Sequence, residues 1–419
     1  MHRGIIHTLK LGVFAGILTC LVNACEKETT PTELPQVITH EVLRTDHNSA
    51  VVSGSIMADG GSRITARGLV WDKKEMPTLA NCLDKSVLTR DSVNFRFHIR
   101  NLTPNQVYHV RAFATNAAGT IYGNQVSFRI SPYLITRDTL PFAGANSIVF
   151  DPLNRIWIGT EGSGIYWRDG NRWRHFTTSV GLVNNHITCM TKDRQGRVWV
   201  GTREGISMYS EATWHNYTTE NGLFNQRIYS LFACSNNYLW IGTNENHLTR
   251  FDGQVFTHFR VSPEGGSSAP GHVHAIFATP NQTVWVGSCY TGLSRYTQDQ
   301  WTHNINGLSD FVWAILLSTE NHLWIGHQHA IYRLANNTWQ SFSPGAMSGF
   351  YSIAEDPQNR IWIACNGGIA LYSSGTWDKI TPLDGLLPDS FSTLHVAPDG
   401  RVLTVSGNIL YTISFFEPK

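Results

Sequence analysis

Arg155-Ile-Trp157-Ile-Gly-Thr160 is the first of seven similar hexapeptides in this chain of 419 residues. A short β-rich unit that recurs every 40 residues or so is typical of a propeller blade. Consecutive copies lie between 38 and 45 residues apart, which predicts an all-β repeat array over residues 132–419. The later copies are centred on Trp199, Trp240, Trp285, Trp324, Trp362 and, in a worn last copy, Leu403.

Each repeat carries four strand signals and a second large aromatic residue. Around Trp362 the strand signals are residues 350–354, 360–364, 369–372 and 376–380. The second aromatic follows the first by 15 or 16 residues, which places it on the fourth strand. We expect both aromatic series to be core. The second series is Trp173, Trp214, Phe256, Trp301, Trp339 and Trp377.

The last repeat is too short to supply its own fourth strand, because the chain ends soon after Leu403. Residues 132–139 precede the first repeat. Tyr133 lies 15 residues before Ile148 of the next first strand, and the fourth-strand residue Trp173 lies 17 residues before the equivalent Met190. We predict that residues 132–139 form the outer strand of the last blade. This pairing would close a seven-bladed β-propeller and remove an open edge.

Residues 36–130 alternate apolar and polar residues in short runs separated by turn residues, which is typical of a β-sandwich. The run from Leu102 through Pro104 to Tyr108 resembles the turn into a late strand of a fibronectin type III domain, where the tyrosine closes a corner. Trp71 is the expected core tryptophan. The resemblance implies a passive spacer or a docking module, since a fold alone does not imply a function.

The first residues indicate export. Residues 1–24 hold a basic start and an apolar run of about twelve residues, which is too short to span a bilayer. The run ends in Val22-Asn-Ala-Cys25, which resembles a bacterial lipobox and implies a lipid on Cys25. An ordinary cleaved signal is the alternative. We expect a lipoprotein signal peptide at 1–24, a tether at 25–35, and an anchor at the outer membrane of a Gram-negative bacterium, facing the periplasm or the surface.

The repeat motif D-x-x-x-R-[IV]-W-[IV]-G-T, as in Asp151 to Thr160, resembles the two-component regulator propeller family, as does a Gly-Leu pair at Gly181, Gly222 and Gly385. The resemblance implies a periplasmic sensor of the kind that precedes a membrane helix and a kinase in glycan-degrading bacteria. This sequence departs from that pattern in having one propeller, no later membrane helix and no kinase. Phosphotransfer is therefore not expected of this chain alone.

Composition narrows the partners. The net charge of +1 gives no electrostatic case for nucleic acid. The sequence shows no phosphate-binding glycine loop and no zinc-type cysteine pairs, so we expect no cofactor and no metal. Five scattered cysteines follow Cys25, and their spacing signals no disulfide framework, so we expect most of them to be free thiols. They are Cys82, Cys189, Cys234, Cys289 and Cys365.

Alignment of the repeats places variable residues at the mouth of the propeller, where the loops before each first strand and after each second strand converge. Aromatic rings with hydrogen-bonding neighbours suit a sugar, whose C–H faces are apolar and whose rim is hydroxyl. The alternative is that the rings only pack between blades. The candidate ligand-binding residues are Tyr229, His274, Trp313, Tyr351, Arg227, His272, Arg203, Tyr290 and His327.

Histidines on three successive repeats raise two further possibilities, a metal site and an acid–base pair. Their spacing fixes no third metal ligand, and hydrogen-bonding or surface roles are the alternatives. The set is His247, His272, His274, His327 and His329.

Three functions remain open. The first is a non-enzymatic envelope lipoprotein whose loop face binds a carbohydrate or a protein. The second is a polysaccharide lyase that uses His274, Tyr229 and Arg227, since the chain offers no paired carboxylates for glycoside hydrolysis. The third is an assembly scaffold that docks partner proteins on both domains.

Overall fold

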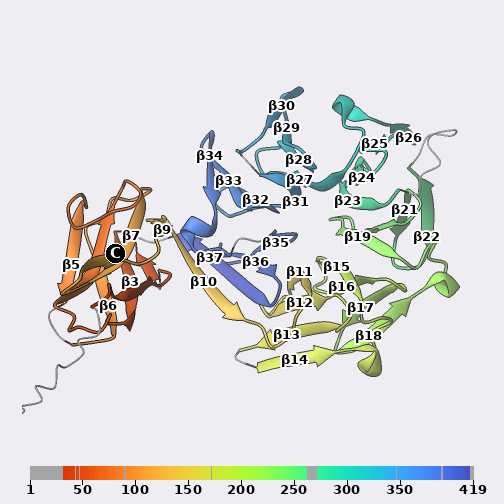
Figure 1. Cartoon of the computed structure of the whole chain (residues 1–419). Coiled ribbons are helices and arrows are strands. Elements are labelled where there is room, and N and C mark those ends of the chain that lie inside the picture. The colour runs from red at the N-terminus through yellow and green to blue at the C-terminus, as the bar shows by residue number, and fades with distance from the viewer. Residues whose placement is uncertain are drawn as a thin grey trace, which may run out of the picture.

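The computed structural model describes residues 32–42, 44–46, 48–88, 91–170, 172–261, 271–345, 347–387 and 390–415. These residues form β-strands and four short 3-10 helices. Figure 1 shows two parts: strands β1 to β9 gather on one side, and the remaining strands form a ring of sheets. The predicted signal peptide, Cys25 and most of the tether lie outside the described residues.

The N-terminal part consists of two sheets with a shared core. One has the order β1-β3-β2, with β6 also paired to β3, and the other has the order β5-β4-β7-β8, with β9 also paired to β7. The strands are β1 (Gln36–Thr39), β2 (Arg44–Asp46), β3 (Ser49–Ala58), β4 (Ala66–Asp72), β5 (Asp84–Leu88), β6 (Asn94–Ile99), β7 (Val107–Asn116), β8 (Gly119–Tyr122) and β9 (Val126–Arg129).

The turn before β7 closes as the sequence predicted. The backbone N–H of Thr103 donates to the hydroxyl of Tyr108 over 3.0 Å. Tyr108, Leu102 and Trp71 are all buried between the two sheets, in one core cluster. A buried tyrosine needs a partner for its hydroxyl, and here the partner is the chain that leads into its own strand.

Residues 133–415 form seven four-stranded sheets, each with its strands in sequential order except the last. The first three sheets are β11 (Ala145–Phe150), β12 (Ile156–Thr160), β13 (Ile165–Asp169), β14 (Arg172–Phe176); β15 (Ile187–Lys192), β16 (Val198–Thr202), β17 (Ile206–Ser210), β18 (Thr213–Tyr217); and β19 (Ile228–Ala233), β20 (Leu239–Thr243), β21 (His247–Phe251), β22 (Phe256–Arg260).

The next three sheets are β23 (Val273–Ala278), β24 (Val284–Ser288), β25 (Leu293–Thr297), β26 (Gln300–Thr302); β27 (Val312–Leu317), β28 (Leu323–His327), β29 (Ile331–Ala335), β30 (Thr338–Phe342); and β31 (Ser348–Glu355), β32 (Ile361–Asn366), β33 (Gly368–Ser373), β34 (Thr376–Ile380). The last sheet has the order β10-β37-β36-β35, with β10 (Tyr133–Thr139), β35 (Leu394–Val396), β36 (Val402–Ser406) and β37 (Ile409–Phe415).

The ring is continuous. The first strand of each sheet contacts the first strand of the next, from β11 through β31 to β35, and β35 and β36 contact β11. Strand β10 pairs antiparallel with β37 over its whole length, from Tyr133 opposite Phe415 to Thr139 opposite Ile409. The segment that precedes the first repeat therefore forms the outermost strand of the last sheet, in the place that the repeat register predicted.

The repeated motif has a structural explanation. Trp157 lies on a second strand and is fully buried, and its Nε1–H donates to Asp151 Oδ2 over 3.0 Å. The same carboxylate accepts from Arg155 Nε over 2.6 Å. A Cβ on Gly159 would lie 2.6 Å from Ile187 of the next sheet, so the glycine permits the close approach of neighbouring sheets. The residues of the motif thus stabilise the packing of one sheet on the next.

The second aromatic series differs in burial from the expectation. Its six residues lie on the fourth strands, as predicted, but their side chains are half-buried. The fourth strand is the outermost strand of each sheet, so its rings pack on the core from the side and stay partly open to water. The expectation that they are core is therefore wrong in degree. Each still packs against a buried cluster, as Trp214 does against that of Trp157.

Three of the four 3-10 helices explain the Gly-Leu pairs. Gly181, Gly222 and Gly385 follow η1 (Thr178–Val180), η2 (Thr219–Asn221) and η4 (Pro382–Asp384) with left-handed backbone, and the leucine after each is buried. The remaining helix is η3 (Ile305–Gly307). Among the described residues, no helix has the length and apolarity needed to cross a bilayer. The five described cysteines are all free.

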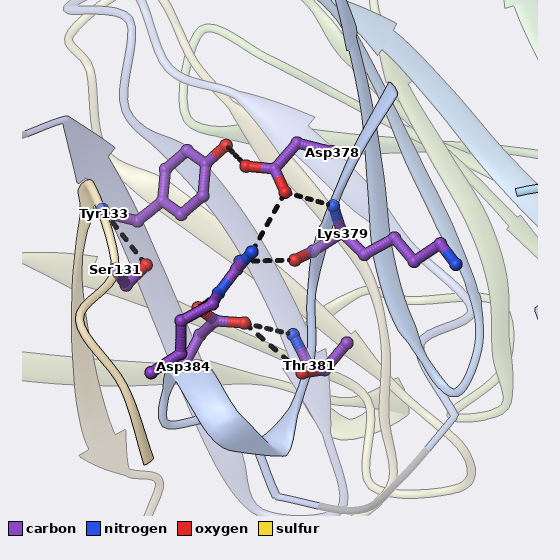
Figure 2. A network of polar contacts seen from close by, with 7 residues as sticks. Ser131, Tyr133, Asp378, Lys379, Thr381 and Asp384 are labelled. Carbon is purple, nitrogen blue, oxygen red and sulfur yellow. Dashed lines mark hydrogen bonds and ion pairs between the residues drawn. The ribbon is translucent and has the colours of Figure 1, made fainter. Parts of the chain in front are cut away.

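A buried polar network joins the two parts (Figure 2). Arg129, the last residue of β9, donates from Nε to Asp384 Oδ1 over 2.6 Å, from Nη1 to Asp378 Oδ1 over 3.1 Å and from Nη2 to the Lys379 carbonyl over 2.6 Å. The hydroxyl of Tyr133 donates to Asp378 Oδ2 over 2.5 Å. The Asp384 side chain is fully buried and that of Arg129 is 17% exposed, so their ion pair is shielded from water more than the contact with the partly exposed Asp378. The sandwich is therefore fastened to the sheet that β31 to β34 form.

The tether enters at the far end of the sandwich. The backbone N–H of Glu33 donates to Gly60, and its carbonyl accepts from Asn116 Nδ2 over 2.6 Å. Asn116 ends β7, whereas the other end of β7 pairs with Arg129 at the junction. The sandwich thus separates the tether from the ring of sheets by the length of its own strands.

Candidate functional site

The residues before and within the first strands come together at one end of the ring, because neighbouring first strands lie side by side. Seven of the rings found there form a connected group, which we call the aromatic arc. It draws on four successive sheets, from the one that begins with β19 to the one that begins with β31. The aromatic arc consists of Tyr229, His272, His274, Tyr290, Phe311, Trp313 and Tyr351.

Ring contacts run through the aromatic arc without a break. Tyr229 stacks on His272 with centroids 4.2 Å apart and meets His274 edge to face at 5.6 Å. His274 lies 4.5 Å from Trp313, and Trp313 meets Tyr351 edge to face at 5.5 Å. Six members are half-buried, so each ring is held by its neighbours while part of its surface remains open.

A branch of the aromatic arc leads outward from Trp313. Phe311 stacks on Trp313 at 5.2 Å and lies 6.0 Å from Tyr290, which is 52% exposed. The indole Nε1–H of Trp313 donates to Gln328 Oε1 over 3.0 Å. This hydrogen bond fixes the orientation of the indole at the centre of the aromatic arc.

Two arginines lie at the Tyr229 end. The guanidinium of Arg227 lies over the Tyr229 ring, 5.5 Å from its centroid. Arg203, on the loop after β16, forms an ion pair with Glu161 over 3.2 Å, and both side chains are exposed. Burial raises the pKa of Tyr229, while the charges of Arg227 and Arg203 act to lower it, so both cations are close enough to be felt by the phenol.

Tyr351 is set by an unusual stretch of backbone. Its hydroxyl accepts from Asn366 Nδ2 over 3.1 Å. Gly349, two residues earlier, has a φ of 60°, and a Cβ there would lie 2.5 Å from the tyrosine hydroxyl oxygen. The pairing of β31 with β32 is irregular at this point. The glycine therefore makes room for the side chain at the other end of the aromatic arc.

Eight of the nine candidate residues are in or beside the aromatic arc, and His327 is placed differently. His327 is buried and its Nε2 lies 2.5 Å from Asp310 Oδ1, while its Nδ1 accepts from the backbone N–H of His329. Its side chain thus holds the chain before β27 through Asp310. The repeat register predicts His327 at the mouth, but nothing in the repeat pattern marks its partner Asp310.

The histidines do not act as one group. His247 stacks on Phe224 at 3.7 Å, away from His272 and His274. Burial lowers the pKa of His274 to about 4, helped by its neighbour His272, and burial also lowers the pKa of His272, helped by Arg227. Both are neutral at pH 7. Among the described residues, no three His, Cys, Asp or Glu side chains come together in a way that could hold a metal ion.

Two members of the site were not among the candidates. Phe311 lies two residues before Trp313, as Arg227 and His272 lie two residues before Tyr229 and His274, so the repeat register marks its position. Gln328 follows the end of β28, and its bond to Trp313 depends on side-chain geometry that the sequence does not encode.

A cavity of about 800 Å³ lies away from the aromatic arc, at the domain junction. Its lining is largely apolar and includes Val126, Leu134 and Leu383. Two of its three charged groups already have partners: Asp384 binds Arg129, and Arg137 donates to the Gly385 carbonyl over 2.7 Å. The third, Glu41, is exposed. A site that offers few free polar groups gives less basis for specific recognition than the aromatic arc does.

The family model described as "Two component regulator propeller" matches residues 181–204 and 347–367 of this chain. The first segment begins in the turn after β14, contains β15 and β16, and ends in the loop after β16. The second begins just before β31, contains β31 and β32, and ends just after β32. Among curated proteins, none matches the chain.

Solved structures share the fold. Virginiamycin B lyase from Staphylococcus aureus, in a catalytically inactive variant with quinupristin, is 14% identical, with a TM-score of 0.57, and the match covers 68% of this chain and all of that one. A protein described as the extracellular domain of a hybrid two-component system from B. thetaiotaomicron is 15% identical, with a TM-score of 0.58, over 90% of this chain and 54% of that one.

A second such domain from B. thetaiotaomicron is 16% identical, with a TM-score of 0.55, over 89% of this chain. The present chain spans about half the length of these two domains, 54% and 51%. At these identities the likeness establishes a propeller-like all-β fold.

Proposed function

We propose that this protein is a non-enzymatic envelope protein that binds a glycan on the aromatic arc. One observation carries the proposal: ring contacts continue from Tyr229 through His274 and Trp313 to Tyr351, across four sheets. A connected, partly open row of rings with polar neighbours suits an extended chain of sugars, which offers apolar C–H faces and a rim of hydroxyls. A small compact ligand would not need a row of this length.

The rest of the architecture takes its meaning from this role. We propose that the seven sheets are the blades of a seven-bladed propeller related to the two-component regulator propellers, and that residues 36–130 are a fibronectin type III-like domain. With a lipid on Cys25 and export to the outer membrane, the sandwich would hold the propeller off the membrane. The tether enters at Glu33, and the Arg129 junction lies at the opposite end of β7, which supports a spacer role.

A polysaccharide lyase is less well supported than a binding protein. A general base works best with a pKa near the operating pH, and that of His274 is lowered to about 4. The pKa of Tyr229 is raised by burial, which keeps its phenol protonated. Docking of a partner protein on the same rings is a possible outcome of the binding test.

The test is isothermal titration calorimetry of the purified protein with a panel of neutral and acidic oligosaccharides. Each mixture is also monitored for the absorbance of unsaturated uronate products. Binding of an intact glycan with no product supports the proposal. Accumulation of unsaturated product would show a lyase, and flat titrations across the panel together with a co-purifying protein would favour a scaffold.

A further inference from the structure

The Tyr229 end of the aromatic arc carries more positive charge than its surroundings neutralise. Arg227 is exposed and lies over the Tyr229 ring. Among the residues that the structure describes, no carboxylate pairs with Arg227, whereas Glu161 pairs with Arg203. A guanidinium that stacks on an aromatic ring keeps its N–H groups directed outward and free to bind an anion.

Arg203, the second cation at the Tyr229 end, forms only a weak ion pair. Arg203 and Glu161 are 43% and 66% exposed and 3.2 Å apart. An exposed pair of this kind contributes little, because water screens it and both long side chains lose freedom in forming it. A ligand anion placed between Arg203 and Arg227 can therefore compete with Glu161 at a small cost.

The other titratable groups nearby form no ion pair with these two arginines. Glu204, next to Arg203 in the sequence, is exposed, and among the described residues no cation pairs with it. His272 and His274 are neutral at pH 7, as their lowered pKa values require. Glu245, on the loop between β20 and β21 of the same sheet, acts on His247, whose ring packs on Phe224. The far end of the aromatic arc, where Tyr351 meets Asn366, presents neutral hydrogen-bonding groups.

We infer that the glycan is anionic, and that Arg227 and Arg203 bind a carboxylate or sulfate on the sugar that lies beside Tyr229. This inference rests on the proposed function and deepens it. Arginine suits both anions, since its planar fork donates two parallel hydrogen bonds to paired oxygens. The sugar bearing the anion would stack near Tyr229, and the neutral remainder of the chain would follow the rings toward Tyr351.

The experiment compares matched ligands that differ mainly in charge. The purified protein is titrated with oligogalacturonate, with the same oligosaccharide fully methyl-esterified, and with a sulfated galactan oligosaccharide that contains no uronate and its desulfated, neutral form. We expect the charged member of one pair to bind about 10- to 100-fold more tightly, as charge-assisted hydrogen bonds do. The uronate pair and the sulfate pair distinguish the two sources of the anion. We also expect the affinity to fall as salt is added.

Three variants complete the design. Arg227→Gln and Arg203→Gln should reduce the ratio of affinities for the charged ligand and its neutral counterpart, whereas Arg227→Lys should retain part of this preference. Arg172→Gln, at an exposed arginine on β14, is the matched control and should have no effect. If charged and neutral partners bind equally, the inference is overturned while the proposed function stands. If no glycan of either kind binds, both fall.

Discussion

Arg129 of the sandwich and Asp384 of the ring, 255 positions apart in the sequence, form a direct ion pair with Nε 2.6 Å from Oδ1. Asp384 is buried, and its other oxygen accepts from the backbone N–H of Thr381 over 2.9 Å. A buried carboxylate with every oxygen partnered fixes geometry strongly, because removal of one partner leaves a charge without compensation. The pair therefore makes the sandwich a rigid extension of the ring.

Replacement of Arg129 should uncouple the two parts. We expect Arg129→Gln to destabilise the junction by about 3–5 kcal/mol, the cost of leaving a buried charge unpaired. Calorimetry should then resolve separate unfolding transitions for the sandwich and the ring. The exposed Arg96→Gln on β6 serves as control and should unfold as the unaltered protein does. An unchanged thermogram for Arg129→Gln would contradict a rigid junction.

The aspartate six residues before the buried tryptophan should contribute more to the free energy of unfolding than the residue at the same position in repeats without an aspartate. Asp356 accepts from Trp362 Nε1 over 2.7 Å and from Arg360 Nε over 2.5 Å, and also caps two backbone N–H groups of its turn. We expect Asp356→Ala to cost about 3 kcal/mol or more, since buried donors lose their partner.

The chain supplies a matched control for this substitution. Ser318 occupies the equivalent position before Trp324, whose Nε1 is buried and has no hydrogen-bond partner among the described residues. Ser318→Ala removes one acceptor, that of the His322 N–H, and should cost about 1 kcal/mol or less. Urea denaturation compares the two variants. Equal losses of stability would show that the hydrogen bonds of Asp356 to Trp362 and Arg360 contribute nothing beyond the capping of the turn.

Stability should fall as the pH is lowered from about 6.5 to 4. Burial lowers the pKa of both His274 and His395 from 6.5 to about 4, so between these values the unfolded chain binds more protons than the folded one. Each group then contributes a slope of at most about 1.4 kcal/mol per pH unit, with stability highest above pH 6.5.

A variant isolates one of these groups. His395→Gln should reduce the slope of unfolding free energy against pH between 4 and 6.5. Urea denaturation at a series of pH values gives the slope. The same slope with and without His395 would show that this histidine is not the buried neutral group described above.

The sequence predicted those features that the repeat period controls. The period located the buried tryptophans and the pairing of residues 132–139 with the last repeat, because each copy of a repeat must use the same register. It also brought Tyr229, His274, Trp313 and Tyr351 to one face, since equivalent positions in a ring are neighbours. These are consequences of backbone geometry.

Features that depend on single side chains were not predictable. Arg129 and Asp384 meet through a junction between domains, for which neither repeat nor spacing gives a signal. His327 occupies a mouth position in the alignment but turns to Asp310, because a nearby carboxylate offers its buried ring a hydrogen bond. Trp173 and its equivalents are half-buried because their strands are the outermost strands of the sheets. The offset of 15 or 16 residues predicts that they lie on these strands, but it does not indicate how exposed the side chains are.

Binding by the aromatic arc is the central claim, and a comparison of ring variants tests it most directly. The purified protein is titrated with the tightest glycan of the panel before and after the double change Trp313→Ala and Tyr351→Ala. Each ring would cover apolar surface of the sugar at roughly 25 cal/mol per Å², so loss of both rings should weaken binding at least about 10-fold. The control is Tyr238→Ala, a half-buried tyrosine in the hairpin between β19 and β20, at the opposite end of these strands. A folded double variant that binds as tightly as the control would contradict the account.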